Sequence, residues 1–283
     1  MVLESLINPL RAERRPWEMF FLGLLYASVA LFLSTQLFEG LAGLIAVFLT
    51  VIVSVPIVYN TIKLEEKKDT LGLDEKTLLK EHGWALSIFI FLFIGVMFAF
   101  ILWYLFLPGN MVSSVFSVQI DTIQGINSVP VSGNLDGMAV FMKIFFNNVK
   151  VMVFCLLFAF FFGAGAIFIL TWNASVIAVA IGAYTRKHLE TLSYKAGFTA
   201  LGSYLHALSL GLARYVIHGI PEIIAYFIAG LAGGIISVAV VRHDFNSNNF
   251  RKIVLDSVDL ILIAFVVLVI AALIEVFITP TLF

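Results

Sequence analysis

Two glutamates lie within long apolar stretches of the sequence. Glu222 occurs in the run His-Gly-Ile-Pro-Glu, and Glu275 occurs near the C-terminus in Ile-Glu-Val-Phe-Ile-Thr-Pro. An ionised side chain at the centre of a bilayer costs roughly 2.5–3.5 kcal/mol on insertion scales, so acids in such stretches are candidates for a functional site. Burial can also keep a carboxyl group protonated, and two neighbouring carboxyl groups can share one proton. Both residues are therefore candidates for a proton-linked path or for cross-bracing between helices.

Helical spacing predicts that the two acids lie at one depth. Val241 follows Glu222 by nineteen residues, and Glu275 follows Asp256 by the same number. An antiparallel helix pair that turns between these segments returns the second acid to the level of the first, because the rise per residue is constant. Two amides that begin the predicted fourth span, and the histidine before Pro221, reach the same level. The predicted polar layer, in the outer half of the bilayer, consists of Asn147, Asn148, His218, Glu222 and Glu275.

The residues around Glu222 also suggest a local anion site. Pro221 suits the first position of a helix, where its missing N–H costs nothing, and Gly219 allows the preceding turn to bend. Amide groups at such a helix start would hold Glu222 as an anion or receive a negative ligand group. A plainer alternative stays open, because intramembrane Asn, His and Glu often bond helices together at about 0.6–2 kcal/mol per contact without binding a ligand.

Metal-dependent hydrolysis inside the membrane is another alternative. His218 and Glu222 are four residues apart and share one helical face, and His206 or Glu275 would supply further ligands. Against it, the sequence has no HExxH, no GxSxG and no paired-acid signature with a positioned base. We therefore expect a protein without enzymatic activity and without a cofactor, while metal binding stays open.

The composition indicates an integral membrane protein. Of 283 residues, 61% are hydrophobic and 12% are charged, and the mean hydropathy is +1.05, so the chain cannot present a water-facing surface throughout. The lipid bilayer is then its main partner. A formal net charge of -1 provides no basic field for nucleic acid. The single cysteine, Cys155, excludes an intrachain disulfide and a cysteine-based zinc cluster.

Hydropathy predicts an all-α polytopic bundle of about seven transmembrane spans, because a helix needs about 20 apolar residues to cross a bilayer. Two segments are ambiguous: Ala174–Thr185 is short, and Ala196–Ile217 is long but carries polar side chains. We expect one of them to cross and the other to be a re-entrant or interfacial helix. The remaining spans are expected at Trp17–Leu37, Leu41–Ile62, Trp84–Leu107, Phe146–Thr171, Pro221–Val241 and Asp256–Thr279, with Asp256 in the first turn of the last.

The distribution of basic residues predicts the orientation. Seven crossings place eleven Lys and Arg residues on one side, which the positive-inside rule makes cytoplasmic. The N-terminus is then cytoplasmic and the C-terminus lies outside. Arg186, Lys187 and Lys195 join this cytoplasmic set if Ala196–Ile217 is the span, so the charge distribution favours that assignment.

Two polar segments accompany the first two spans. Met1–Pro16 mixes leucines with charges and suits a helix lying in the membrane interface, with an irregular tail as the alternative. Lys63–Gly83 is predicted to be a small cytoplasmic helical hairpin or a solvated loop. These segments and the first helical hairpin make up an N-terminal part, residues 1–83, and residues 84–283 form a membrane core.

Glycines predict where helices pack closely. Gly230 and Gly234 form a GxxxG pattern, and small residues of this kind let two backbones approach in lipid. Tight helix packing is the first interpretation. A homo-oligomer formed through glycine-rich helix faces is the alternative.

An ordered set of these residues resembles the stage II sporulation protein M family. The resemblance covers roughly Trp84–Phe283 and implies a five-helix membrane core, with the first two spans as an N-terminal addition. In spore-forming bacteria the family member works with peptidoglycan-degrading partners during engulfment, which implies envelope-remodelling partners where such proteins exist. The set comprises Phe146-Asn147-Asn148, Gly163-Ala164-Gly165, Asn173, His218-Gly219-Ile220-Pro221-Glu222, and Glu275 with Thr279-Pro280.

These observations leave three functions open. The first is a path for an ion, a proton or a small solute through the polar layer, as discontinuous helices often create binding sites in transporters. The second is a non-enzymatic membrane scaffold for envelope remodelling, and the third is the metal-dependent hydrolase. The candidate path residues are Asn147, Asn148, Asn173, His206, His218, Gly219, Glu222 and Glu275.

Overall fold

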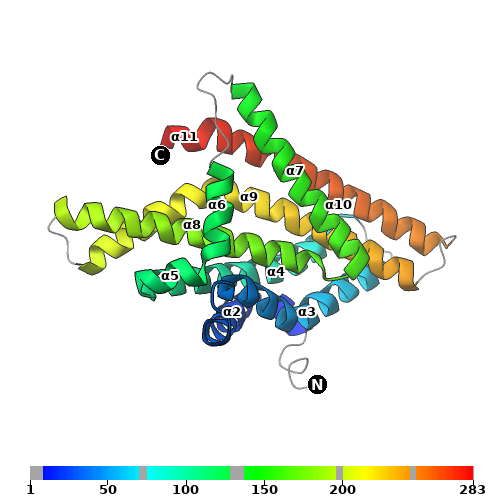
Figure 1. Cartoon of the computed structure of the whole chain (residues 1–283). Helices are drawn as coiled ribbons and strands as arrows, with labels where there is room; N and C mark the ends of the chain where they lie inside the picture. Colours follow the sequence, from blue (N-terminus) through cyan, green and yellow to red (C-terminus); the bar gives the residue numbers. More distant parts are fainter. Residues whose placement is uncertain (1–8, 70–74, 128–136, 196–199, 243–246, 283) are drawn as a thin grey trace.

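The structure, a computed structural model of the chain, describes residues 9–69, 75–127, 137–195, 200–242 and 247–282 (Figure 1). All regular secondary structure in these ranges is helical. The elements are α1 Pro9–Arg14, α2 Glu18–Leu37, α3 Ala42–Asp69, α4 Glu75–Phe106, α5 Gly109–Val115, α6 Ser117–Asn127, α7 Gly137–Phe162, α8 Ala166–Lys195, α9 Ala200–Arg242, α10 Asn248–Leu273, the π-helix η1 Ile274–Ile278, and α11 Thr279–Leu282.

Within the described residues, seven helical segments are long and apolar enough to cross a membrane. They are α2, α3, α4, α7, α8, α9 and the continuous rod formed by α10, η1 and α11. The prediction of an all-α polytopic bundle is thereby confirmed. The protein is an integral membrane protein.

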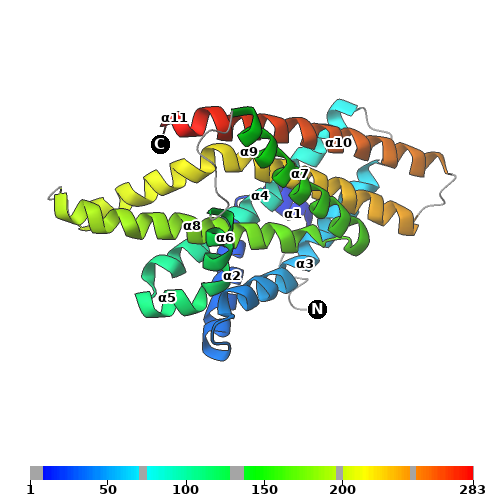
Figure 2. The same ribbon diagram turned by 45° about the horizontal axis from the view of Figure 1, so that its top comes forward.

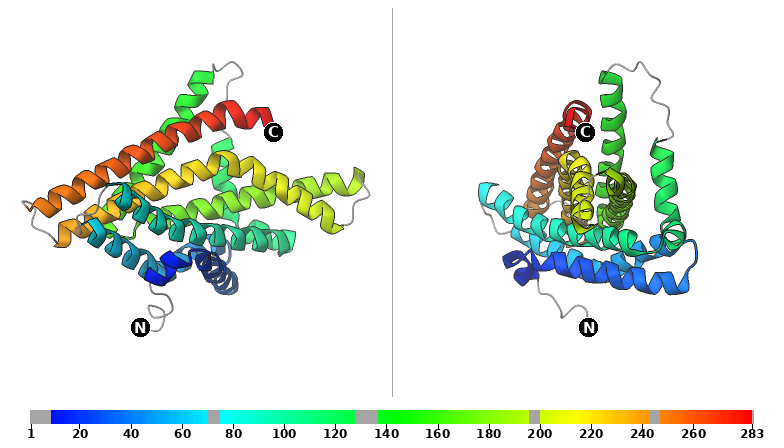
Figure 3. Two further views of the ribbon diagram at one scale, coloured as in Figure 1. Left: turned by 180° about the vertical axis from the view of Figure 1, so that it is seen from behind. Right: turned by 90° about the vertical axis from the view of Figure 1, so that its left-hand side faces the viewer.

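Helix α9 lies at the centre of the bundle. It packs along α10, α7 and α8, and it also contacts α3 and α4. α8 and α9 run antiparallel, and α10 turns back along the other half of α9 (Figures 1 and 2). α7 crosses α9, while α2, α3 and α4 form a layer on one side of α9, and parts of α3 and α4 reach α10 (Figure 3). The middle of α9 therefore lies beside both α7 and the C-terminal end of the α10 rod.

The chain turns sharply at Gly163, so the predicted span Phe146–Thr171 is wrong. α7 ends at Phe162 and α8 begins at Ala166. Gly163 has a φ of 64°, a left-handed conformation that glycine adopts without steric cost. Hydropathy is continuous across this turn, because both flanking helices are apolar, and a hydropathy window cannot detect the break.

Neither ambiguous segment is a separate re-entrant helix. Ala174–Thr185 lies inside α8, and the described part of Ala196–Ile217 begins α9, which continues through Pro221 to Arg242. The predicted helix start at Pro221 is therefore wrong, and so are the free amide groups expected beside Glu222. A proline inside a membrane helix is tolerated where neighbouring helices and local adjustments satisfy the freed backbone groups.

The ends of two other helices also differ from the prediction. α10 starts at Asn248 after the N-cap Ser247, whose side chain accepts the Phe250 N–H, so Asp256 is not in the first turn.

The basic C-terminal part of α8 lies on the other side from the one predicted. Because Ala174–Thr185 belongs to a full span, this part of α8 lies at the opposite end of α9 from Arg242 (Figure 1). The charge argument that favoured Ala196–Ile217 as an independent span is therefore wrong.

The glycine-rich face of α9 packs inside the chain. A Cβ atom at Gly233 would overlap the carbonyl oxygen of Leu156 on α7, and one at Gly230 would lie 2.9 Å from the Ala166 Cβ. Gly234 is equally close to the side chain of Ile62 on α3. Tight packing between helices of the same chain therefore occupies this face of α9, as the first interpretation expected.

The close approach of α2 and α4 at Gly95 provides a test of the fold. A Cβ atom at Gly95 would overlap the carbonyl oxygen of Phe20, whereas nothing lies within 4 Å of a Cβ atom at Gly83 on the same helix. We expect Gly95→Ala to lower the free energy of unfolding by about 1–3 kcal/mol through overpacking. Gly83→Ala should leave it unchanged or raise it by up to about 1 kcal/mol. Denaturation of the two variants in detergent measures the difference, and equal effects would contradict this packing.

Candidate functional site

The candidate site forms where three helical elements meet. α9 contributes residues from its central turns, α7 contributes from its middle, and η1 with α11 contributes from the end of the α10 rod. The rod reaches this level because α9 and α10 are antiparallel neighbours. The nineteen-residue spacing thus brings the C-terminal acid back to the middle of α9.

Two carboxyl groups and one amide form the centre of the site. The side chain of Asn148, only 7% exposed, donates a hydrogen bond from Nδ2 to Oε1 of Glu222. The carboxyl groups of Glu222 and Glu275 are close enough to interact directly. Two ionised carboxylates at such a distance repel each other, and they share a hydrogen bond only when one of them carries a proton. The arrangement therefore suits a pair that holds one proton.

One face of α9 carries the polar residues of the site at intervals of four. His218 lies one turn before Glu222, and its Nδ1 is 3.2 Å from Oγ1 of Thr279 on α11. Arg214 lies one turn earlier, with its guanidinium over the Tyr184 ring at 5.6 Å. Tyr226 lies one turn after Glu222 and is 4% exposed. In chain order, this face of α9 therefore carries a guanidinium, an imidazole, a carboxyl group and a buried phenol.

The structure does not bring the other predicted residues to this centre. Asn147 is exposed on α7, and the side chain of Asn173 donates to the Ile169 carbonyl of its own helix at 2.8 Å. His206 is exposed about 18 Å along α9 from His218, given the rise per residue of an α-helix. Gly219 lines an apolar cavity of about 350 Å³ between α4, α8 and α9, away from the acids.

The family resemblance included Thr279, but spacing did not place it beside His218, and Tyr226 was not predicted. The four-residue spacing of His218, Glu222 and Tyr226 is visible in the sequence once α9 is known to be one helix. No sequence signal predicts the position of Thr279, because it depends on the π-helix before it.

Metal coordination is not supported by the geometry. Within the parts of the chain that the structure describes, no three His, Cys, Asp or Glu side chains come together in a way that could hold a metal ion. His206, proposed as an additional ligand, is far from His218 and Glu222.

A second charged cluster joins the C-terminal part of α3 to the N-terminal part of α4. For this region the sequence predicted either a helical hairpin or a solvated loop. Lys68 on α3 contacts Glu13 at 2.9 Å, Glu65 at 2.8 Å and Glu81 at 2.9 Å. Nδ1 of His82 lies 2.9 Å from the fully buried Glu65. We name these five residues the Lys68 cluster. They join α1, α3 and α4, so Lys63–Gly83 is not merely a loop in water.

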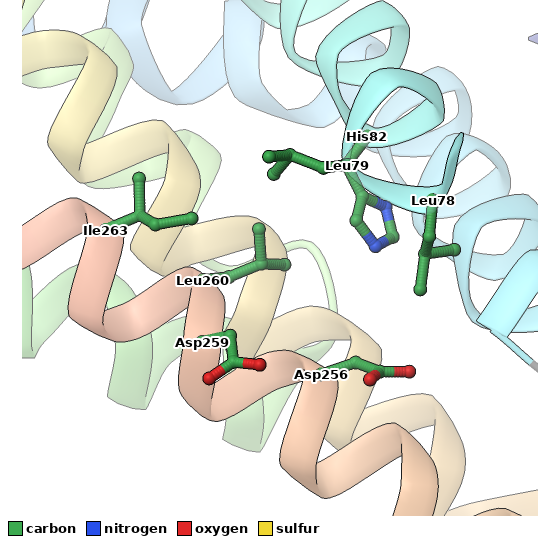
Figure 4. Close-up of a pocket in the computed structure, with 7 residues that line it drawn as sticks. All are labelled: Leu78, Leu79, His82, Asp256, Asp259, Leu260 and Ile263. Atoms are coloured by element: carbon green, nitrogen blue, oxygen red, sulfur yellow. The ribbon is translucent and has the colours of Figure 1, made fainter. Parts of the chain in front are cut away.

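The neighbourhood of the Lys68 cluster adds two features. Arg242 at the end of α9 contacts Glu66 at 2.9 Å, which ties α3 to the central helix. His82 also faces a cavity of about 180 Å³ whose other polar lining residues are Asp256 and Asp259 on α10 (Figure 4). Burial raises the pKa of Glu13 above its ordinary value, although Lys68 contacts it.

The chain matches the model of a known protein family. The model of the family described as stage II sporulation protein M matches residues 87–280, which is more than half of the chain. The match begins within α4, leaves α2 and α3 outside, and includes every residue of the candidate site. No curated protein and no solved structure matches the chain.

Proposed function

The chain belongs to the stage II sporulation protein M family, and from this premise we propose that it carries an ion or small solute across the membrane. The path uses the polar face of α9, with Glu222 and Glu275 at its centre. We further propose that the N-terminus is cytoplasmic and the C-terminus lies outside, because seven spans place the termini on opposite sides and most basic residues share the side of the N-terminus.

One observation carries this proposal: the two acids contact each other without a cation. Within the described residues, no Lys or Arg forms an ion pair with Glu222 or Glu275. Other buried acids of this protein do have cationic partners. Lys68 and Arg242 form ion pairs with the buried acids Glu65 and Glu66, which join α1, α3, α4 and α9. Acids that only brace helices are stabilised by such partners. The Glu222–Glu275 pair instead depends on a mobile positive species, a proton or a cation.

Reconstitution of the full chain into liposomes tests the proposal. Proton, sodium and potassium gradients are imposed in turn, and fluorescent indicators inside the vesicles report the flux of each ion. We expect flux above that of protein-free vesicles for at least one species. Absence of flux for all of them would reject the path and leave a non-enzymatic scaffold for envelope-remodelling partners as the better hypothesis.

The adjacent asparagines provide a matched pair of variants. Asn148→Leu removes the amide that donates to Glu222, and it leaves a buried carboxyl group without that bond. We expect a roughly tenfold loss of flux, equivalent to about 1.4 kcal/mol. Asn147→Leu makes the same chemical change at an exposed position and should retain wild-type flux. If both variants behave alike in the liposome assay, Asn148 has no part in the path.

A further inference from the structure

The end of the α10 rod contains a π-helix beside His218. In η1 the backbone N–H of Thr279 donates to the carbonyl oxygen of Ile274, five residues earlier, and the Thr279 hydroxyl donates to the same oxygen at 3.2 Å. A π-helical turn changes the face of the helix on which the following residues lie, and such turns are frequent at functional sites. Here Thr279 is placed against His218 of α9.

The hydrogen bonds of Thr279 determine the tautomer of His218. A carbonyl oxygen only accepts, so the single hydroxyl hydrogen of Thr279 goes to Ile274. The 3.2 Å contact between Oγ1 and Nδ1 then requires a hydrogen on Nδ1. A neutral imidazole of this form has its lone pair on Nε2. Among the described residues no protein group bonds to Nε2, which leaves that nitrogen open to exchange protons.

We propose that the species handled at the Glu222–Glu275 pair is the proton, and that Thr279 is a positioning residue that holds His218 in the tautomer able to relay it. This inference rests on the proposed function and names its substrate. Two neighbouring carboxyl groups without a Lys or Arg partner favour a shared proton, whereas no group of acids and histidines among the described residues has the arrangement of a metal site.

The relay step conserves atoms and charge. Nε2 of His218 takes a proton from a hydronium ion, which becomes water, and the ring becomes an imidazolium with a hydrogen on each nitrogen. It then releases the Nε2 proton to the carboxylate of the Glu222–Glu275 pair, and its Nδ1–H remains bonded to Thr279. His218 returns to its starting tautomer, so no ring flip is needed before the next proton.

Charges on each side of His218 suit this role. The Glu275 carboxyl on η1 attracts the imidazolium, and the Arg214 guanidinium on α9 repels it. One turn after Glu222, α9 presents Tyr226, and α7 presents the neutral amide of Asn148 to Glu222.

Two measurements on the full-length protein in liposomes test the inference. The first is the ¹⁵N spectrum of histidine-labelled protein, in which His218→Asn identifies the His218 signals and thus its tautomer. The second is proton flux, driven by a potassium gradient with valinomycin and read with an internal pH indicator. The variants are Thr279→Val, which removes the hydroxyl at similar volume, and Thr279→Ser, which keeps it. Thr281→Val is the matched control, because Thr281 is exposed and its hydroxyl bonds only to its own helix.

We expect wild-type His218 to carry its hydrogen on Nδ1. Thr279→Val should lose this preference and reduce proton flux at least about tenfold, as for loss of a positioned proton carrier. Thr279→Ser should restore both, and Thr281→Val should change neither. A hydrogen on Nε2 in the wild type, or Thr279→Val with normal tautomer and flux, would overturn the inference. Sodium or potassium flux without proton flux would also overturn it but leave the proposed path standing, whereas no flux of any ion rejects both.

Discussion

Glu222→Gln is expected to reduce ion flux to the level of protein-free liposomes. Glutamine has nearly the same shape and can still accept from Asn148 and bond to Glu275, but it cannot bind and release a proton or balance a cation. Proton-carrying side chains contribute roughly 10²–10⁴-fold to rates, so the expected loss is at least about 10²-fold. The measurement is flux in the liposome assay at matched protein content.

Two controls separate this effect from damage to the fold. Glu39→Gln removes an exposed carboxyl group from the turn between α2 and α3 and should keep full flux. Because Glu222 and Glu275 interact directly and act as one pair, the double variant Glu222→Gln with Glu275→Gln should be no worse than either single variant. Normal flux in Glu222→Gln, with thermal unfolding unchanged, would be incompatible with the path.

Lys68→Met is expected to cause the largest loss of stability. Lys68 contacts three carboxylates, and its side chain is 12% exposed while that of Glu65 is fully buried. Without the ammonium group, like charges remain close together in a poorly hydrated region. Removal of one partner from a buried ion pair typically costs about 3–5 kcal/mol, and we expect a loss of this size in the free energy of unfolding. Denaturation in detergent provides the measurement.

A neighbouring lysine on the same helix gives the comparison. Lys63 is exposed on α3, so Lys63→Met should change the free energy of unfolding by no more than about 0.5 kcal/mol. Lys68→Arg keeps the positive charge and should retain more stability than Lys68→Met. Equal stability of the Lys68→Met and Lys63→Met variants would show that the Lys68 cluster does not hold α1, α3 and α4 together.

The common depth of Glu222 and Glu275 could be predicted because it depends only on residue spacing and on a constant helical rise. Which of Asn147 and Asn148 contacts Glu222 could not be predicted from the sequence. Adjacent residues of a helix point about 100° apart, and which of them meets Glu222 depends on how α7 crosses α9. The position of Thr279 was equally hidden, because the π-helix before it shifts the last turn against α9.

By itself the sequence determined that the chain is helical, crosses a membrane about seven times and contains acids at one depth, since these properties follow from hydropathy and spacing along a single chain. Tertiary structure decided where the helices begin and end around Gly163 and Pro221, because a glycine turn and a tolerated proline leave hydropathy unchanged. It also decided that Lys68 is buried among carboxylates instead of dissolved in water. Burial is a property of packed neighbours, which a single segment does not contain.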